Sequence, residues 1–232
     1  MNQIQELKER SFLVYGLGST GISVIKFFNK NKIKNFKIWD DNKKIKYKNF
    51  KAKNLAQTLN QVDFIVLSPG ISLIKNKKLN KFKKKIITDI DLFYLTKKNL
   101  KTIVVTGTNG KSTTCKLLTH LLQKNKLKSS LVGNIGTPIL NEKYKKNNYV
   151  VIEASSFQLS HSKFIYPDYA FFLNFSNDHL NWHGSKDAYL ASKLKIFQLQ
   201  KKKNIAIINK KLKKNFIKKK FLSKLVIPKN KD

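Results

Sequence analysis

The chain has 232 residues, 41% of them hydrophobic and 11% aromatic, which allows one large or two smaller domains and excludes a compositionally disordered protein. It has no apolar run of about 18 residues, no signal-peptide pattern in residues 1–10 and one cysteine, Cys115, so we expect a cytoplasmic protein without membrane insertion or internal disulfides. The net charge of +35 suggests nucleic-acid binding, but Arg10 is the one arginine among 48 basic residues and the lysines are spread along the chain, so we expect no nucleic-acid partner.

Strands alternate with helices along the first 97 residues. Short apolar runs predict the strands, and apolar residues at helical spacing, such as Ile22, Ile25 and Phe28, predict the helices. The predicted strands are 11–15, 36–40, 62–67 and 86–87, and the predicted helices are 21–28 and 89–95. This alternation is typical of a Rossmann-like α/β domain with a parallel sheet.

A glycine motif, Gly16-Leu-Gly-Ser-Thr-Gly21, joins the first strand to the first helix. Asp40 and Asp41 follow about 20 residues later at the end of the next strand, where a carboxylate can accept hydrogen bonds from ribose hydroxyls. The pattern favours nucleotide binding at the helix N-terminus and fits NAD, but it does not identify the nucleotide. A glycine turn needed only for packing remains the alternative.

A polar, basic connection at residues 96–101 predicts a domain boundary, with a first domain at 1–97 and a second at 98–232. In the second domain the alternation restarts, and Leu117, Leu118, Leu121 and Leu122 are expected to pack inward from one helix. The predicted strands are 102–106, 130–132, 149–153, 169–174 and 204–208, and the predicted helices are 112–123 and 185–199. The lysine-rich tail, 210–232, is weakly patterned.

A second glycine motif, Thr106-Gly-Thr-Asn-Gly-Lys-Ser-Thr113, lies between a strand and a helix. Its backbone N–H groups can surround phosphates, Lys111 can reach the β- and γ-phosphates, and Ser112 can bind Mg²⁺. Val105 occupies the position where the common form of the motif has its first glycine, so this is a variant phosphate-binding loop for ATP. Cys115 is expected to be a small buried side chain.

Polar residues follow three more strands of the second domain. Asn134, Glu153 and His179 each lie at or just beyond a predicted strand end, which places them on the ligand-binding edge of a parallel sheet. Glu153 is a suitable ligand for Mg²⁺, and His179 could bind a metal or a substrate oxygen. Each has an alternative structural role, Glu153 as a solvated strand end and His179 as a loop cap.

With these motifs the chain resembles the Mur ligase family of peptidoglycan synthesis. The resemblance rests on Gly107–Thr113, the Gly-Asn-Ile-Gly turn at 133–136, Glu153-Ala-Ser-Ser-Phe-Gln158, Asp178-His179 and the helix around Lys193. Within the family, Ser68-Pro-Gly-Ile71 and Asp89-Ile-Asp-Leu-Phe93 resemble the branch that adds D-glutamate to UDP-N-acetylmuramoyl-L-alanine. The resemblance implies that the first domain binds the UDP of this substrate rather than NAD.

The resemblance also implies roles for individual residues. ATP would bind at Gly107, Thr108, Asn109, Gly110, Lys111, Ser112 and Thr113, and the UDP substrate at Ser19, Thr20, Asp40, Asp41, Ser68, Gly70, Asn134 and Ser155. Lys111, Asn134, Glu153, His179 and a carbamylated Lys193 would be catalytic. Ser112 and Glu153 would hold one Mg²⁺, and His179 and the Lys193 carbamate a second.

The implied reaction is ATP-dependent formation of an acyl phosphate, which the amine of D-glutamate then attacks. The family has three domains, so the resemblance implies that the ATP-binding domain is incomplete here and that the C-terminal ligase domain is absent. We therefore expect a ligase-derived, monomeric chain whose own activity is in doubt. The alternatives are a non-catalytic remnant that binds a nucleotide or UDP-sugar, an NAD-dependent oxidoreductase and a lysine-driven nucleic-acid binder.

Overall fold

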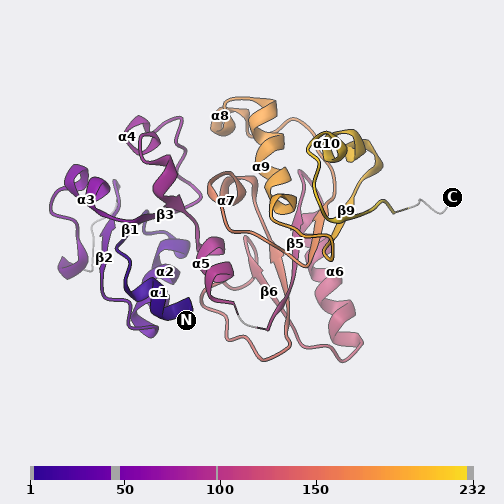
Figure 1. Cartoon of the computed structure of the whole chain (residues 1–232), viewed down its shortest axis with the longest axis horizontal. Helices are drawn as coiled ribbons and strands as arrows, with labels where there is room; N and C mark the ends of the chain where they lie inside the picture. The colour runs from indigo at the N-terminus through magenta and orange to yellow at the C-terminus, as the bar shows by residue number, and fades with distance from the viewer. Residues whose placement is uncertain (1–2, 43–47, 98, 229–232) are drawn as a thin grey trace.

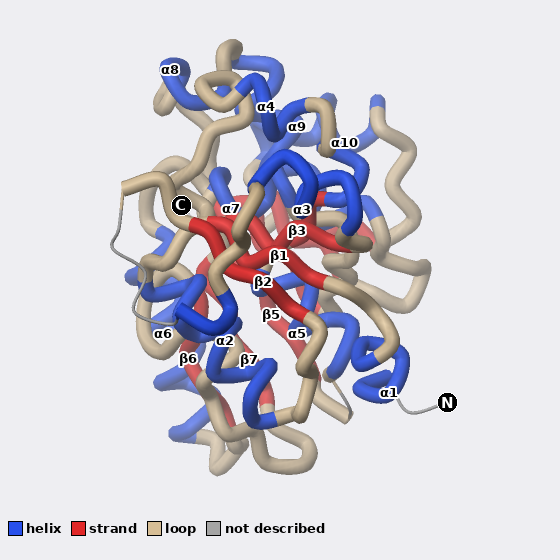
Figure 2. Tube along the Cα trace, turned by 90° about the vertical axis from the view of Figure 1, so that its left-hand side faces the viewer, coloured by secondary structure: helices blue, strands red, loops and turns tan. Residues whose placement is uncertain are grey.

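The fold is α/β and contains two parallel sheets, seen at the left and right of Figure 1. The computed structural model describes residues 3–42, 48–97 and 99–228. Every strand pair within these ranges is parallel. Figure 2 shows the strands in the interior with helices around them. Among the described helices, none combines the length and apolar character needed to cross a bilayer.

The first sheet has the strand order β2-β1-β3-β4. Its strands are β1 (Phe12–Tyr15), β2 (Phe36–Trp39), β3 (Phe64–Leu67) and β4 (Ile86–Ile87). Its helices are α1 (Gln3–Lys8), α2 (Ser19–Lys30), α3 (Leu55–Gln61) and α4 (Lys77–Asn80), with 3₁₀ turns at Lys48–Phe50 and Lys83–Lys85. β1 is buried along its whole length because helices cover both faces of the sheet, which explains its unbroken apolar sequence.

The second sheet has the order β10-β9-β8-β5-β7-β6. Its strands are β5 (Lys101–Thr106), β6 (Ser129–Gly133), β7 (Tyr149–Glu153), β8 (Tyr169–Phe172), β9 (Ile205–Ile208) and β10 (Lys224–Val226). Its helices are α6 (Lys111–Lys124), α7 (Ser156–His161), α8 (Leu180–His183), α9 (Lys186–Gln198) and α10 (Lys213–Lys218), with a 3₁₀ turn at Lys210–Leu212. β5 lies inside this sheet, so the loop that follows it opens at the centre of the carboxyl edge.

Helix α5 (Asp89–Thr96) lies between the two sheets (Figure 1). The Thr88 hydroxyl caps its N-terminus by accepting the Asp91 N–H, and the Asp91 carboxylate accepts the Thr88 backbone N–H. Leu92 belongs to the core of the first half, whereas Phe93 and Tyr94 belong to the core of the second. One short helix therefore contributes to both hydrophobic cores.

The predicted strands and helices agree with the structure to within a few residues, but the short helices α1, α3, α7 and α8 were not predicted, and two further expectations need correction. Leu118 and Leu122 pack inward from α6 as expected, but Leu117 and Leu121 are 55% and 47% exposed, because they lie on the opposite face of the helix. The tail also contains α10 and β10, which its sequence pattern did not predict. The expected boundary at 97/98 stays a prediction, since residue 98 lies outside the described residues.

Candidate active site at the carboxyl edge of the second sheet

The phosphate-binding loop follows β5 and leads into α6. Gly110 precedes α6 with φ +80°, a left-handed conformation that glycine adopts without strain. Lys111 donates from its Nζ to the carbonyl oxygens of Gly107 (2.9 Å) and Thr108 (2.7 Å). The lysine is thus folded over its own loop, with its ammonium group at the place where the loop could receive phosphates.

Asn174, just beyond the neighbouring strand β8, holds the loop in place by hydrogen bonds. Its side-chain oxygen accepts from the Asn109 N–H at 2.9 Å, and its Nδ2 donates to the Asn109 carbonyl at 3.0 Å. Thr108 adds a third connection, donating from its hydroxyl to the Ser176 carbonyl. These bonds fix the backbone of the loop before any ligand binds.

Glu153, at the end of β7, is a carboxylate in direct contact with the loop and is only 1% exposed. Ser112 Oγ donates to its Oε2 at 2.8 Å, and Asn134 Nδ2 donates to its Oε1 at 2.8 Å. The Asn134 backbone N–H also donates to the Glu153 carbonyl. Three predicted site residues from separate segments therefore meet at one buried carboxylate, which overturns the solvated-strand-end alternative for Glu153.

The Ser112 hydroxyl and the Glu153 carboxylate are hard oxygen donors, which suit Mg²⁺. No group of three or more His, Cys, Asp or Glu side chains within the described ranges could hold a metal ion. This donor set still fits Mg²⁺, because Mg²⁺ usually takes one or two carboxylates and fills its other positions with phosphate oxygens and water.

Lys193 projects from α9 toward the loop and is 1% exposed. Its Nζ donates to the Gly107 carbonyl at 2.7 Å and lies 4.7 Å from the centre of the Tyr189 ring. Burial, together with the positive charge of Lys111, lowers the pKa of Lys193 to about 7. A large fraction of this amine is therefore uncharged and nucleophilic near neutral pH.

His179 immediately precedes α8, in a left-handed conformation with φ +52°. Its Nδ1 lies 3.3 Å from an Asp178 oxygen, and its ring packs 4.8 Å from the ring of Phe157. Both His179 and Lys193 contact the ring of Tyr189, so the structure brings them to one neighbourhood. It does not join them by a hydrogen bond within the part of the chain that is described.

Tyr189 and Asn174 are the site residues that the sequence did not single out. Tyr189 is buried, and its hydroxyl lies 3.3 Å from the Thr108 hydroxyl of the loop. Asn174 is the last residue of the predicted strand 169–174, a position at the carboxyl edge of the sheet that indicates a site residue. Tyr189 resembles any core residue of an amphipathic helix, and its role becomes visible only in three dimensions. Cys115 is fully buried as expected.

The first glycine motif lies at the carboxyl end of β1, at the edge of the first sheet. Gly16 has φ +94°, and a Cβ at Gly21 would lie 1.9 Å from the Gly16 carbonyl, so the turn itself requires both glycines. A Cβ at Gly18 or Gly70 would meet nothing within 4 Å. The fold therefore does not require these two glycines, whereas the close approach of a phosphate would.

The other residues predicted to contact the UDP substrate have the following positions and hydrogen bonds within the protein. Asp40 accepts the Leu17 backbone N–H at 2.6 Å, and Ser68 Oγ donates to the Gly16 carbonyl at 2.8 Å. Asp41 accepts from the side chains of Tyr15 and Trp39. Ser19 and Thr20 form the first turn of α2. In the second half, Ser155 caps α7.

Comparison with known proteins agrees with this arrangement. The Mur ligase middle domain matches residues 105–231, and the N-terminal domain of MurD-like Mur ligases matches residues 10–90. UDP-N-acetylmuramoylalanine–D-glutamate ligase of Rickettsia prowazekii is 41% identical over 212 residues, covering 87% of this chain and 47% of the relative. The enzyme of that name from Hydrogenobaculum is 40% identical over 205 residues, covering 86% of this chain and 46% of the relative.

Solved structures share the fold at low sequence identity. A Neisseria meningitidis ligase, described as UDP-N-acetylmuramate:L-alanyl-γ-D-glutamyl-meso-diaminopimelate ligase, has a TM-score of 0.55 at 13% identity, covering 94% of this chain and 77% of that one. MurF of Acinetobacter baumannii has a TM-score of 0.51 at 13% identity, covering 97% and 52%. The chain spans about half the length of the curated relatives it matches. Since the middle-domain match alone extends over more than half of its residues, the chain belongs to the Mur ligase family.

Proposed function

We propose that this chain provides the UDP-binding and ATP-binding parts of a ligase that adds D-glutamate to UDP-N-acetylmuramoyl-L-alanine. The observation that carries the proposal is the Glu153 carboxylate, held between Ser112 of the phosphate loop and Asn134. The carboxylate is a hard oxygen ligand and Asn134 an amide donor, and both lie beside the loop that would bind the triphosphate. The name shared by the curated relatives supports the choice of substrates.

The second half would activate a carboxylate, which is a poor acyl donor, by transferring the γ-phosphoryl group of ATP to it. Gly107–Thr113 would hold the triphosphate, and Lys111 would turn from the loop carbonyls to the phosphates and neutralise their developing charge. Mg²⁺ bound by Ser112 and Glu153 would neutralise phosphate charge as well. The amine of D-glutamate would then displace phosphate from the acyl phosphate.

A second metal position would use His179 and a carbamate on Lys193. The support for carbamylation is the buried, largely neutral amine, because only a neutral amine can attack CO₂. An ammonium group at Lys193 would repel a cation, whereas the carbamate supplies an anionic oxygen. Asn134 would orient the substrate beside the reacting carboxylate.

The first half would hold the UDP group. Its support is the open space at Gly18 and Gly70, together with the Asp40 carboxylate bonded to the Leu17 N–H in the glycine turn. Ser19, Thr20, Asp41 and Ser68 would complete the site, with Ser155 reaching it from the second half. The reaction would take place in the cytoplasm, where ATP and UDP-linked precursors are available.

Two measurements test the proposal. Titration with ATP and Mg²⁺ should show binding that weakens at least about tenfold in Glu153→Ala, because a ligand worth over 1.4 kcal/mol is removed. The matched control Asp187→Ala removes an exposed carboxylate in the first turn of α9 and should leave ATP binding unchanged. Undiminished Mg²⁺-dependent ATP binding in Glu153→Ala would refute the assignment.

The second measurement is product formation from ATP, UDP-N-acetylmuramoyl-L-alanine and D-glutamate. The chain is assayed alone and together with the part of the Rickettsia prowazekii relative beyond the matched region. Phosphate release that requires both substrates and Glu153 supports the ligase. Nucleotide binding without turnover in either mixture would favour the non-catalytic alternative, and NAD binding at the first glycine motif would favour an oxidoreductase.

A further inference from the structure

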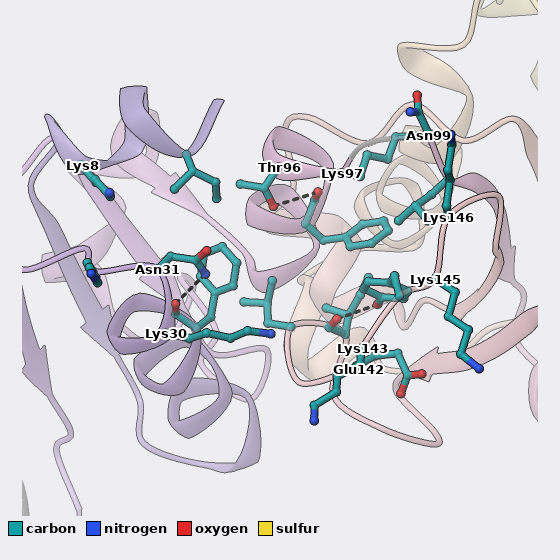
Figure 3. A pocket seen from close by; sticks show the side chains of 18 residues that line it. Lys8, Lys30, Asn31, Thr96, Lys97, Asn99, Glu142, Lys143, Lys145 and Lys146 are labelled. Carbon is teal, nitrogen blue, oxygen red and sulfur yellow. Dashed lines mark hydrogen bonds between the residues drawn. The ribbon is translucent and has the colours of Figure 1, made fainter. Parts of the chain in front are cut away.

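A cleft of about 950 Å³ lies between the two halves, at the edge of the sheets opposite to the phosphate loop. Asn99 and Leu100 on its wall precede β5, whereas the phosphate loop follows that strand. β5 is six residues long, which separates the two sites by roughly 20 Å. Figure 3 shows side chains from the first half at the left and from the second half at the right. None of the proposed active-site residues lines this cleft.

Lysines from both halves surround the cleft. They are Lys8, Lys30, Lys32, Lys143, Lys145 and Lys146. Within the described residues, none of these side chains forms a hydrogen bond or an ion pair, in contrast to Lys97, which pairs with Asp168 at 3.8 Å. The carboxylate on the wall, Glu142, accepts a hydrogen bond from Ser130. These six lysines outnumber the one carboxylate in the lining, so the rim keeps an excess of positive charge.

Part of the cleft floor is apolar. Its lining includes Phe27, Phe93, Ile139, Leu140 and Tyr144. The Tyr144 hydroxyl donates to the Ile139 carbonyl at 2.6 Å, which fixes the Tyr144 ring in the wall of the cleft. Lysine is abundant over the whole chain, and lysines alone would not distinguish this place. An apolar floor beneath unpaired lysines, in a cavity of small-ligand size, does distinguish it.

We propose that this cleft is a second binding site, for a small organic anion that carries at least two negative charges and an apolar ring or chain. The apolar group would lie on the floor beside Phe27 and Tyr144, and the charges would meet the lysines at the rim. Because the walls belong to both halves, a bound anion would remove lysine repulsion across the cleft and stabilise the contact between the halves. This site is independent of the proposed ligase activity.

Fluorescence titration with pyrenetetrasulfonate, a flat aromatic polyanion, tests the site at about 150 mM salt, where distant surface charges are screened. Replacing Lys143, Lys145 and Lys146 together by Gln should weaken binding about tenfold, since three favourable charge contacts are lost. The matched control replaces Lys214, Lys218 and Lys219, which are exposed on and just after α10, and should change binding less than about twofold. Circular dichroism confirms that both triple variants are folded.

Two further arms make the test specific. Inorganic tripolyphosphate, which has charge but no apolar group, should compete at least about tenfold less tightly than the probe binds, because it cannot bury apolar surface. Lys111→Ala should leave probe binding intact, since the phosphate loop lies on the opposite edge. Equal losses in the two triple variants, tripolyphosphate binding as tight as the probe, or loss of binding in Lys111→Ala would each overturn the proposal.

Discussion

At the scale of single residues, the largest departure from ordinary chemistry in the candidate active site is Lys193. An amine with a pKa of 10.5 is under about 1% neutral at pH 8. Burial and the charge of Lys111 lower the pKa of Lys193 to about 7, so at pH 8 most of its amine is neutral. The position that would need an anionic metal ligand is thus occupied by the kind of lysine that CO₂ can modify.

Lys193 should therefore take up CO₂ at pH 8 and lose it at pH 6. Carbamylation consumes a neutral amine and releases a proton, so acid both protonates the amine and reverses the reaction. The measurement is the ¹³C NMR carbamate signal of the protein in ¹³C-bicarbonate. Lys193→Gln should remove one carbamate signal that Lys195→Gln retains, because the pKa of Lys195 is lowered less, to about 8, and its Nζ donates to the Ser160 and Ser162 carbonyls away from the phosphate loop. An unchanged set of carbamate signals in Lys193→Gln would contradict the assignment.

Asp89 should make the protein less stable as pH rises from about 4 to 6. Burial, followed by the charge of Asp91, raises the pKa of Asp89 from 3.8 to about 6, and its Oδ1 has no hydrogen-bond partner within the described residues. The folded state therefore binds the proton more tightly than the unfolded state, and up to about 3 kcal/mol of stability is lost across this window. Urea unfolding of Asp89→Asn, compared with the unaltered chain at each pH, isolates this contribution.

The contributions of the buried histidines to the pH dependence of stability cancel in that comparison. Burial lowers the pKa of His161 and of His183 to about 4, which makes the folded protein less stable as pH falls from 6.5 toward 4. Both histidines are present in the chain and in Asp89→Asn. A stability difference between the two that does not change with pH would show that Asp89 is charged in the fold.

At the scale of secondary-structure elements, α5 attaches the two halves through one carboxylate. Asp91 is fully buried, and its Oδ1 accepts the backbone N–H groups of Lys163 (2.8 Å) and Phe164 (2.7 Å). Its Oδ2 accepts the Thr88 N–H, and the Thr88 hydroxyl bonds the Ser162 hydroxyl. Removing the carboxylate leaves buried donors without partners.

Asp91→Ala should lower the free energy of unfolding by about 3 kcal/mol or more, the usual consequence of stranding several buried hydrogen-bonding groups. Asp187→Ala is the matched control, because Asp187 is an exposed acid in the first turn of α9 and its loss should change stability by less than about 1 kcal/mol. Urea unfolding measures both. Equal effects in the two variants would mean that the bonds across α5 contribute nothing specific.

Sequence patterns predicted these elements unevenly, for physical reasons. β1 and β5 were predictable because buried parallel strands need continuous apolar runs. α7 was missed although Ser155 and Gln158 form a capping box that could have been found in the sequence. α10 and β10 are rich in lysine, so few apolar residues mark their periodicity. The four leucines of α6 lie at helical spacing, but their pattern does not show which face of the helix packs against the sheet. For this reason the sequence predicts Leu117 and Leu121 to be buried, although both are exposed.

The candidate site was predictable as a set of segments but not as a geometry. The rule that ligands bind at the carboxyl ends of parallel strands brought Asn134 and Glu153 to the phosphate loop, and the structure joins them by hydrogen bonds. The stacking of Lys193 on Tyr189 depends on the packing of α9 against the loop. Contacts of that kind between distant segments depend on how the helices pack, and a residue pattern does not specify them.

At the scale of the whole molecule, the two halves should unfold together. α5 contributes Leu92 to one core and Phe93 and Tyr94 to the other, so neither half can lose its core without exposing part of the other. The chain has two tryptophans: Trp39 lies in β2 of the first half, and Trp182 lies in α8 of the second half, where its carbonyl accepts a hydrogen bond from Ser72 of the first. Trp182→Phe and Trp39→Phe therefore leave single fluorescent reporters of the first and second halves.

In urea, the two single-tryptophan variants should show the same unfolding midpoint by fluorescence. Each fluorescence midpoint is first compared with the circular-dichroism midpoint of the same variant, which removes the effect of the tryptophan substitution itself on stability. Adding Asp91→Ala removes the bonds from α5 to Lys163 and Phe164 and should separate the two midpoints. The more stable half then unfolds at a higher urea concentration, because unfolding of one half no longer leaves buried hydrogen-bond donors of the other half without partners. Midpoints that already differ in the unaltered background would mean that α5 is a passive connection and that the halves are independent folding units.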